Sequence, residues 1–474
     1  MSGDAEDRIR ADRIAKVDAM RAAGVDPYPA RTPARVPVAE VRERFGDLEA
    51  GAETDTRLAV AGRIAARRGH GKAMFLDLAD RTGRLQLHAT LDSLGEEPYA
   101  ALADTDLGDV IAGEGDVFVS RRGELSLRVR EWQMLAKCLR PLPEKWHGLT
   151  DIELRHRRRY VDLIVNEDSR ALAMARSRMV TAMRAVLDGD GFVEVETPIL
   201  QPIYGGASAH PFTTYYNEFE RNFYLRIADE LYLKRLIVGG LERVYEIAKD
   251  FRNEGVSFKH NPEFTMLEWY EAYGDYEVGM ERVERVIAAA GAAAGSEIDL
   301  TPPWPRVSLR EAIHEHAGID PMADRDRDRL VAHLRAADID TTADETWADA
   351  VDHLLSHFVE PAIERPTFLV DYPVELSPLA KRLPGDPGLV ERFEAFCVGM
   401  ELGNGYTELN DPDDQRARFE ALGQADDDYV LALEYGMPPT VGVGIGIDRL
   451  LMALRGVRSI REVILFPTLR DRVD

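Results

Sequence analysis

The alternation of apolar and polar residues from about Arg57 to Ala136 constrains the fold of this chain more than any other feature. Short strands of period two are separated there by turn signals, among them Asp80-Arg-Thr-Gly83 and Ser120-Arg-Arg-Gly123. Several such strands in about 80 residues favour a small closed barrel, because closure removes exposed strand edges. The pattern predicts an OB-fold barrel.

The chain has 474 residues, which is enough for two or three domains. An amphipathic helix is predicted from about Glu6 to Ala23, before the barrel. After the linker Pro141-Leu-Pro143, a helical pattern runs from Asp168 to about Gly189, and mixed helices and strands follow. Strands there often succeed strands without a crossover helix, which indicates an antiparallel sheet. The predicted fold class is α+β.

The net charge of −25 by itself argues against a nucleic-acid partner. The stretch from Arg57 to Lys145, however, contains 14 Lys/Arg and 13 Asp/Glu, so its net charge is about +1 and that of the rest of the chain is about −26. The slight excess of basic over acidic residues is therefore confined to the predicted barrel.

Other features bear on location. No apolar run approaches the ~20 residues that cross a bilayer, and the acidic N-terminus lacks the basic and apolar regions of a signal peptide. Two cysteines cannot form a disulfide framework. A cytoplasmic protein without a membrane partner is expected.

One face of the barrel carries candidate nucleic-acid contacts. Alternation places Phe75 opposite its apolar neighbours, and it places Gln86 and Glu124 on the outer side of later strands, with Arg68 just before the first hairpin. An aromatic ring among polar and basic groups is how such folds stack and read unpaired bases. The alternative is that Phe75 packs beneath the N-terminal helix or a loop.

The segment from Phe251 to Phe264 is predicted to be a polar loop between two strands. Arg252 supplies a planar fork for a carboxylate or phosphate. Phe264 offers a ring for a purine, and Glu254 an acceptor for its exocyclic amine. An exposed charged hairpin tip is the alternative interpretation.

Two later strands concentrate polar side chains. Glu268 and Tyr270 share one strand face, and Asn404, Tyr406 and Glu408 share another at period two. Buried carboxylates require a cationic partner or else take up protons. These groups predict a pocket for a small cation; a half-exposed polar strand face is the alternative.

Alternation also creates a conflict, because it puts Glu401 on the opposite face from Asn404. Both reach one site only if the glycines in this strand host a bulge or bend. The strand Val441–Ile447 alternates glycine with apolar residues, which suits a flat strand beneath a ligand, and Arg449 follows at the start of a helix.

These segments resemble the class II aminoacyl-tRNA synthetases. The strings similar to motifs 1, 2 and 3 are Gly191-Phe-Val-Glu-Val-Glu-Thr-Pro198, Phe251-Arg-Asn-Glu through Glu263-Phe264, and Gly442–Arg449. The lysine branch of the family is indicated by Tyr224–Leu233, His260–Met266 and Asn404–Asp411. The similarity covers nearly the entire chain.

The resemblance implies an antiparallel-sheet catalytic domain flanked by helices, acting on ATP, L-lysine and tRNA-Lys with Mg²⁺. It implies an ATP site of Arg252, Glu254, His260, Phe264, Glu394, Glu401 and Arg449. By the same resemblance, Arg252 and Arg449 are expected to be the catalytic members, and Glu394 and Glu401 are expected to bind the metal.

The same resemblance implies the lysine-binding residues Glu230, Glu268, Tyr270, Asn404, Tyr406 and Glu408, with Glu408 and Tyr270 at the ε-ammonium and Asn404 at the carboxylate. It implies the anticodon-reading residues Arg68, Phe75, Gln86 and Glu124. The expected domains are an N-terminal helix and extension (1–55), an OB-fold anticodon-binding domain (56–145) and the catalytic domain (146–474). Motif 1 implies a homodimer.

Three departures from the family pattern occur. His210 and Met400 stand where Arg or Lys is usual, and the chain is shortened between Gln415 and Tyr435. None removes a matched ligand, but they allow for a specialised copy. An aspartyl or asparaginyl synthetase, a protein lysyl ligase without the barrel, and a non-catalytic RNA-binding regulator are the rival interpretations.

Overall fold

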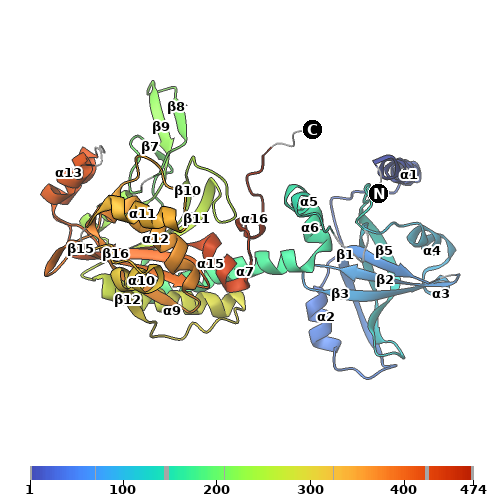
Figure 1. Ribbon diagram of the computed structural model, residues 1–474. Coiled ribbons are helices and arrows are strands. Elements are labelled where there is room, and N and C mark those ends of the chain that lie inside the picture. Colours follow the sequence, from blue (N-terminus) through green and yellow to red (C-terminus); the bar gives the residue numbers. More distant parts are fainter. Residues whose placement is uncertain are drawn as a thin grey trace. The chain divides into compact units, whose positions relative to one another are not determined.

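A computed structural model describes residues 3–69, 71–143, 149–207, 209–323, 325–421 and 426–470 (Figure 1). The chain divides into two compact units, Met1–Leu149 and Thr150–Asp474. The expected domain boundary between residues 145 and 146 lies outside the described residues. Within the described part, no helix has the length and apolar character needed to span a membrane.

The first unit contains the predicted closed barrel, with strand order β1–β2–β3–β5–β4. Its strands are β1 Glu53–Arg68, β2 Ala73–Ala79, β3 Arg84–Thr90, β4 Val110–Val119 and β5 Leu125–Ala136. Both predicted hairpins are present, since β2 pairs with β3 and β4 with β5 in antiparallel fashion. Leu76, Leu87 and Leu127 are fully buried inside, as the period-two pattern requires.

The helices of the first unit are α1 Gly3–Ala22, α2 Val38–Phe45, α3 Leu91–Leu94 and α4 Glu96–Ala103. The first corresponds to the predicted amphipathic helix. Val38 and Val41 of α2 are buried in the same apolar cluster as the barrel interior.

The second unit is built on a sheet with strand order β12–β13–β15–β16–β17–β11–β10–β6, with β14 paired to β15. The strands are β6 Val193–Glu194, β10 Arg243–Phe251, β11 Glu263–Ala272, β12 Arg306–Ser308, β13 Thr367–Pro373, β14 Arg382–Leu383, β15 Asp386–Cys397, β16 Met400–Thr407 and β17 Thr440–Gly446. Its central pairs are antiparallel, as predicted. The edge strands β6 and β12 instead run parallel to their neighbours.

A smaller sheet of β7 Leu200–Gln201, β8 Thr213–Tyr216 and β9 Arg221–Leu225 completes the strands of this unit. The helices are α5 Ile152–Arg157, α6 Arg159–Val165, α7 Glu167–Gly189, α8 Glu230–Val238, α9 Tyr276–Ala294, α10 Leu309–Ala317, α11 Arg327–Ala336, α12 Trp347–Leu354, α13 Pro412–Ala421, α14 Asp427–Glu434, α15 Ile447–Arg455 and α16 Ile460–Val463. Short helical turns lie at Leu355–Val359, Glu360–Ala362 and Val374–Leu376.

Helices α7 and α9 bury the apolar side of the large sheet. Met183 of α7 and Ile287 of α9 belong to one fully buried cluster with Leu267 and Trp269 of β11. Because side chains alternate along a strand, Glu268 between them points to the other side of the sheet. That side carries the polar residues of the site.

Candidate functional site

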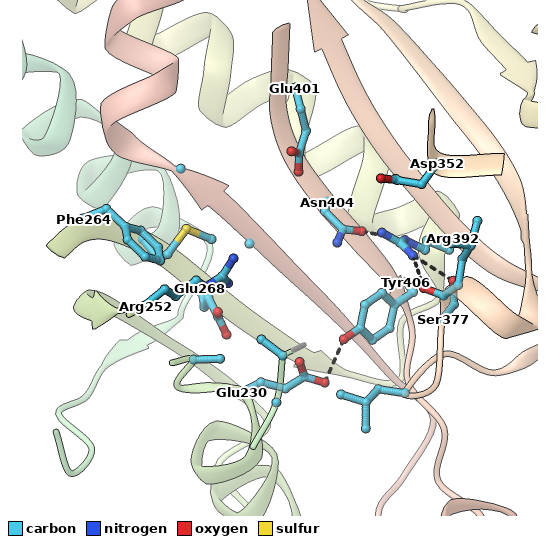
Figure 2. A pocket seen from close by; sticks show the side chains of 18 of the residues that line it. Glu230, Arg252, Phe264, Glu268, Asp352, Ser377, Arg392, Glu401, Asn404 and Tyr406 are labelled. Atoms are coloured by element: carbon cyan, nitrogen blue, oxygen red, sulfur yellow. Dashed lines mark hydrogen bonds between the residues drawn. The ribbon is translucent and has the colours of Figure 1, made fainter. Parts of the chain in front are cut away.

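A cavity of about 1070 Å³ opens over the polar side of the sheet. It is lined by β11, β16 and β17, by the loop between β10 and β11, and by the start of α12 (Figure 2). It brings together these residues of the predicted set: Glu230, Arg252, Glu254, His260, Phe264, Glu268, Tyr270, Glu401, Asn404, Tyr406 and Arg449. Glu394 and Glu408 do not line it and are buried behind its wall.

The floor of the cavity needs glycine on β17. A Cβ built at Gly442 would lie 2.1 Å from Glu408 Oε1 and 2.4 Å from the ring of Tyr270. Neither side chain could keep its place beside a larger residue. The alternating glycines of this strand therefore leave room for the acidic groups that meet there.

The loop between β10 and β11 contributes Arg252, Glu254 and His260 to the cavity wall, and Glu254 and His260 are exposed there. The Arg252 guanidinium lies over the Phe264 ring, 5.1 Å from its centroid. His260 Nε2 lies 3.0 Å from Arg449 Nη2, and Arg449 Nη1 donates to Glu401 Oε2 at 2.8 Å. Burial and the charge of Arg449 lower the pKa of His260, which favours its neutral form. Two guanidinium groups thus face one cavity, an arrangement suited to phosphates.

The strand irregularity required for Glu401 and Asn404 to share a site is present. Ala395 pairs with Gly403, but the next residue, Phe396, pairs with Glu401, so Leu402 is an extra residue on β16. Leu402 is buried in the apolar cluster. The shift returns Glu401 to the polar side, where Figure 2 shows it above Asn404.

Glu394 lies on β15 opposite Asn404. Its Oε1 accepts a hydrogen bond from Arg392 Nη2 at 2.6 Å, and its Oε2 accepts one from the Tyr372 hydroxyl at 2.9 Å. Burial raises the pKa of Glu394 to about 7 despite the opposing charge of Arg392. The ionised carboxylate therefore has too little positive charge around it. Together with Glu401, it fits the oxygen-ligand preference of Mg²⁺.

Arg392 was not singled out in the sequence. Its Nε donates to Asn404 Oδ1 at 3.1 Å (Figure 2). Its Nη2 donates to Glu394 Oε1, so one guanidinium orients two residues of the predicted site. Its position two residues before Glu394 on the same strand was the available signal.

Side chains from which a small-cation pocket was predicted meet at the other end of the cavity, where they contact a cation of the chain itself. Lys234 Nζ donates to Glu230 Oε1 at 2.6 Å and to Glu408 Oε2 at 2.7 Å. The Tyr406 hydroxyl also donates to Glu230 Oε1, at 2.8 Å. Sequence reasoning missed Lys234, although its spacing of four residues from Glu230 on a helix is typical of an ion pair.

The pKa values of acidic groups at this end of the cavity are strongly shifted. Burial raises the pKa of Glu408 to about 8, although Lys234 opposes the rise, and burial raises that of Glu268 to about 8. Glu268 Oε2 accepts from the Tyr270 hydroxyl at 3.2 Å. Oxygens of Glu268, Asp229 and Asp250 lie within 4.8 Å of one another, a convergence that the sequence did not reveal. The pocket is therefore short of positive charge.

In the first unit, the pairing of the barrel strands brings residues of the predicted outer face close together. Arg68 pairs with Phe75 and Phe75 with His88, while Gln86 is on the neighbouring row. The half-buried Phe75 ring stacks on His88 with centroids 4.6 Å apart and 17° between their planes. Gln86 Oε1 accepts from a buried Ser126 hydroxyl at 3.0 Å.

The remaining members of this face are charged. Arg68 Nη2 is 2.7 Å from Asp77 Oδ1, and Glu124 is exposed immediately before β5. The structure thus brings Arg68, Phe75 and Gln86 onto one side of the barrel, with Glu124 at the end of a neighbouring strand.

The structure describes two of the three departures from the family pattern, His210 and Met400. Met400 is partly buried and packs against the main apolar cluster, which explains an apolar residue at that position. His210 is exposed, and its carbonyl accepts from the Asn253 amide at 2.7 Å, so its backbone supports the loop that carries Arg252. Part of the shortened segment, 422–425, lies outside the described residues.

Comparison with known proteins agrees with both units. Residues 151–470 match the family of tRNA synthetases class II (D, K and N), and residues 58–135 match the family described as OB-fold nucleic acid binding domain. The chain is 49% identical to the lysine–tRNA ligase of Chloroflexus aurantiacus, over 98% of this chain and 99% of that protein. It is 47% identical to the lysine–tRNA ligase of Moorella thermoacetica over the whole of both chains, and 46% identical to that of Pelotomaculum thermopropionicum over 98% and 95%.

Proposed function

The chain belongs to the lysine–tRNA ligases of class II, and on that premise we propose which of its residues perform each part of the reaction. The enzyme activates L-lysine with ATP and transfers the lysine to the 3′ end of its tRNA. The observation that carries the assignment is the pairing, in one cavity, of two guanidinium groups with a buried acidic pocket.

ATP occupies the end of the cavity around Arg252, Phe264 and Arg449. Arg252 binds the α-phosphate and the lysine carboxylate, and Arg449 binds the γ-phosphate end. Phe264 stacks on the adenine, and Glu254 and His260 complete the site. The lysine carboxylate oxygen attacks the α-phosphorus in line, and the bond to pyrophosphate breaks.

No side-chain nucleophile is needed for this step, so positioning and charge neutralisation supply the rate. A hydroxyl of the terminal tRNA ribose then attacks the adenylate carbonyl, and AMP leaves. Glu394 and Glu401 would hold Mg²⁺, which neutralises phosphate charge when bound. The raised pKa of Glu394 supports this role, because a nearby cation would stabilise its ionised form.

Lysine occupies the acidic end. Glu230 and Glu268 supply the charge for its ammonium groups, Asn404 and Tyr406 contact it from β16, and Glu408 with Tyr270 receives the ε-ammonium. This pocket carries more carboxylates than cations, so it would repel the side chain of aspartate. An aspartyl enzyme is thereby disfavoured.

We also propose the domain assignment 1–55, 56–145 and 146–474, with Arg68, Phe75, Gln86 and Glu124 reading the anticodon. A homodimer formed through motif 1 is supported by exposed apolar side chains in and just after it, since Val193 and Leu200 are half exposed. The strand β6 also ends the order of the large sheet. A cytoplasmic location is consistent with two free cysteines.

Lysine should bind more tightly as pH rises from about 6 to about 8. The pKa values of Glu268 and Glu408 are both about 8 without lysine, so below that pH both carboxyl groups tend to hold protons. An ammonium ligand requires their ionised forms, and its binding must release those protons. The dissociation constant should fall by up to about tenfold per pH unit for each proton released, and then level off.

Calorimetry of lysine binding in buffers of different ionisation enthalpy measures this release directly. ATP and Mg²⁺ are omitted so that titration of Glu394 does not contribute. A dissociation constant that is flat between pH 6 and 8, with no proton release, contradicts the assignment of these two carboxylates.

Phe75→Ala should depress tRNA aminoacylation while leaving lysine-dependent pyrophosphate exchange nearly unchanged. A base stacked on such a ring contributes about 1–3 kcal/mol, or roughly ten- to a hundredfold in tRNA use. The ring belongs to the first unit and the ATP site to the second, so adenylate formation should not respond.

Phe45→Ala is the matched control, because this aromatic residue packs against the barrel core from α2. It should lower the melting temperature without a selective loss of aminoacylation. If Phe75→Ala instead reduces both activities and the melting temperature together, Phe75 packs the barrel and does not read the anticodon.

A further inference from the structure

Lys234 is a fully buried cation at the lysine end of the cavity. It lies on α8 with a side chain that is 0% exposed, between Glu230 and Glu408. The Tyr429 ring centroid is 5.5 Å from its Nζ. Burial alone would lower the pKa of the Lys234 ammonium, but the charges of Glu230 and Glu408 raise it well above its ordinary value. Its two carboxylate partners therefore favour the charged form of Lys234.

Each of its two carboxylate partners uses one oxygen for Lys234 and has another available. Glu408 binds Lys234 through Oε2, and its Oε1 is buried with no hydrogen-bond partner among the described residues. That free oxygen faces Gly442 and Tyr270, at the floor of the cavity. Glu230 binds Lys234 through Oε1 and lines the cavity itself.

The charge of this arrangement matches one further ammonium group. Two carboxylates and one ammonium leave a net charge of −1 in the ionised state. Without Lys234, two neighbouring buried carboxylates would repel each other, and at least one would become protonated. A protonated Glu408 would present a neutral group to the substrate.

We propose that Lys234 is a positioning residue for lysine recognition: it anchors Oε2 of Glu408, favours the ionised form of that carboxylate and directs Oε1 at the ε-ammonium of the substrate. This inference rests on the proposed role of Glu408. The Lys234 side chain is fully buried and its Nζ donates to both Glu230 and Glu408, so it acts through its carboxylate partners and not by contact with lysine.

The alternative is a purely structural role, in which Lys234 ties α8 to the segment after β16. L-Norleucine separates the two roles, because it has the same straight chain without the terminal ammonium. A positioning role predicts that loss of Lys234 weakens only ligands that carry the ammonium. A structural role predicts equal weakening of both amino acids.

In Lys234→Met, the KM for lysine in pyrophosphate exchange should rise by about ten- to a hundredfold, because a buried charge loses its partner. The inhibition constant of norleucine and the KM for ATP should stay within about threefold of their wild-type values, since neither ligand carries an ε-ammonium for Glu408 to bind. A rise in the norleucine constant that matches the rise for lysine overturns the proposal.

Lys137→Met is the matched control. Lys137 is also buried, with Nζ hydrogen-bonded to Asp106 and to Asp109, the latter at 2.6 Å, but it belongs to the first unit. It should lower the melting temperature without changing the KM for lysine. A wild-type enzyme that shows no lysine-dependent exchange would contradict the proposed function itself, which separates that failure from a failure of the Lys234 role.

The double variant Lys234→Met/Glu408→Gln provides a test should the single variant not fold. If Lys234 acts through Glu408, the double variant should activate lysine within about threefold of Glu408→Gln alone. A further loss of tenfold or more would show that Lys234 acts independently of Glu408, and the proposal would be wrong.

Discussion

Glu394→Gln is expected to reduce adenylate formation by about a thousandfold while the protein remains folded. Glutamine retains the size of the side chain and can still hydrogen-bond to Arg392 and Tyr372, which hold the carboxylate in the wild type. It cannot supply the negative charge that a Mg²⁺ site beside Glu401 requires. Glu401→Gln should act in the same direction.

The measurement is lysine-dependent pyrophosphate exchange across a magnesium titration. Glu271→Gln is the control, since Glu271 is a buried carboxylate of the same sheet that binds Arg282 of α9 at 2.7 Å, on the side of the sheet away from the cavity. It should keep its exchange activity as long as it folds. Near-normal exchange by Glu394→Gln at ordinary magnesium concentrations would refute the metal role.

Local pattern was sufficient to predict the barrel and the long helix of the second unit. Apolar residues at period two predicted the buried interior around Leu76 and Leu87, and therefore also the outer position of Phe75. The helix expected from Asp168 to Gly189 is α7, Glu167–Gly189. These features depend on neighbours within a few residues, which a sequence displays directly.

The contacts that complete the site are long-range, and local pattern does not contain them. Lys234 and Glu408 are separated by 174 positions along the chain, yet they form a buried ion pair. The extra residue Leu402, which lets Glu401 share a site with Asn404, depends on how β15 pairs with β16. The alternation of side chains showed that Glu401 and Asn404 fall on opposite faces of a regular strand. It could not locate the extra residue, because pairing register is a tertiary property.

Lys234 also bears on the alternative interpretation of the chain as an aspartyl-tRNA synthetase. A buried lysine would by itself suggest a partner for an acidic substrate side chain. Both carboxylates nearest to it belong to the chain, however, and they occupy its ammonium at 2.6 and 2.7 Å. The positive charge is therefore already used, and the oxygen left without a partner is an acceptor for a cation.

Glu408→Gln is expected to raise the KM for lysine by roughly thirty- to several-thousandfold, with little change in the KM for ATP. The loss corresponds to about 2–5 kcal/mol, the cost of removing one partner from a buried charge pair. Glu408 Oε1 has no partner within the described residues, so in the wild type it is available to the substrate ammonium. The phosphate end of the cavity does not include Glu408.

Two measurements separate this role from simple destabilisation. Glu284→Gln is the control, because Glu284 is buried and accepts from the Trp304 amide at 2.7 Å away from the cavity; it should leave the KM for lysine unchanged. The pH dependence of lysine binding should also become shallower in Glu408→Gln, since one of the carboxyl groups with a pKa of about 8 has been removed from this pocket. The substrate assignment is wrong if the variant keeps the wild-type KM for lysine, because an ammonium that loses a buried carboxylate partner must bind more weakly.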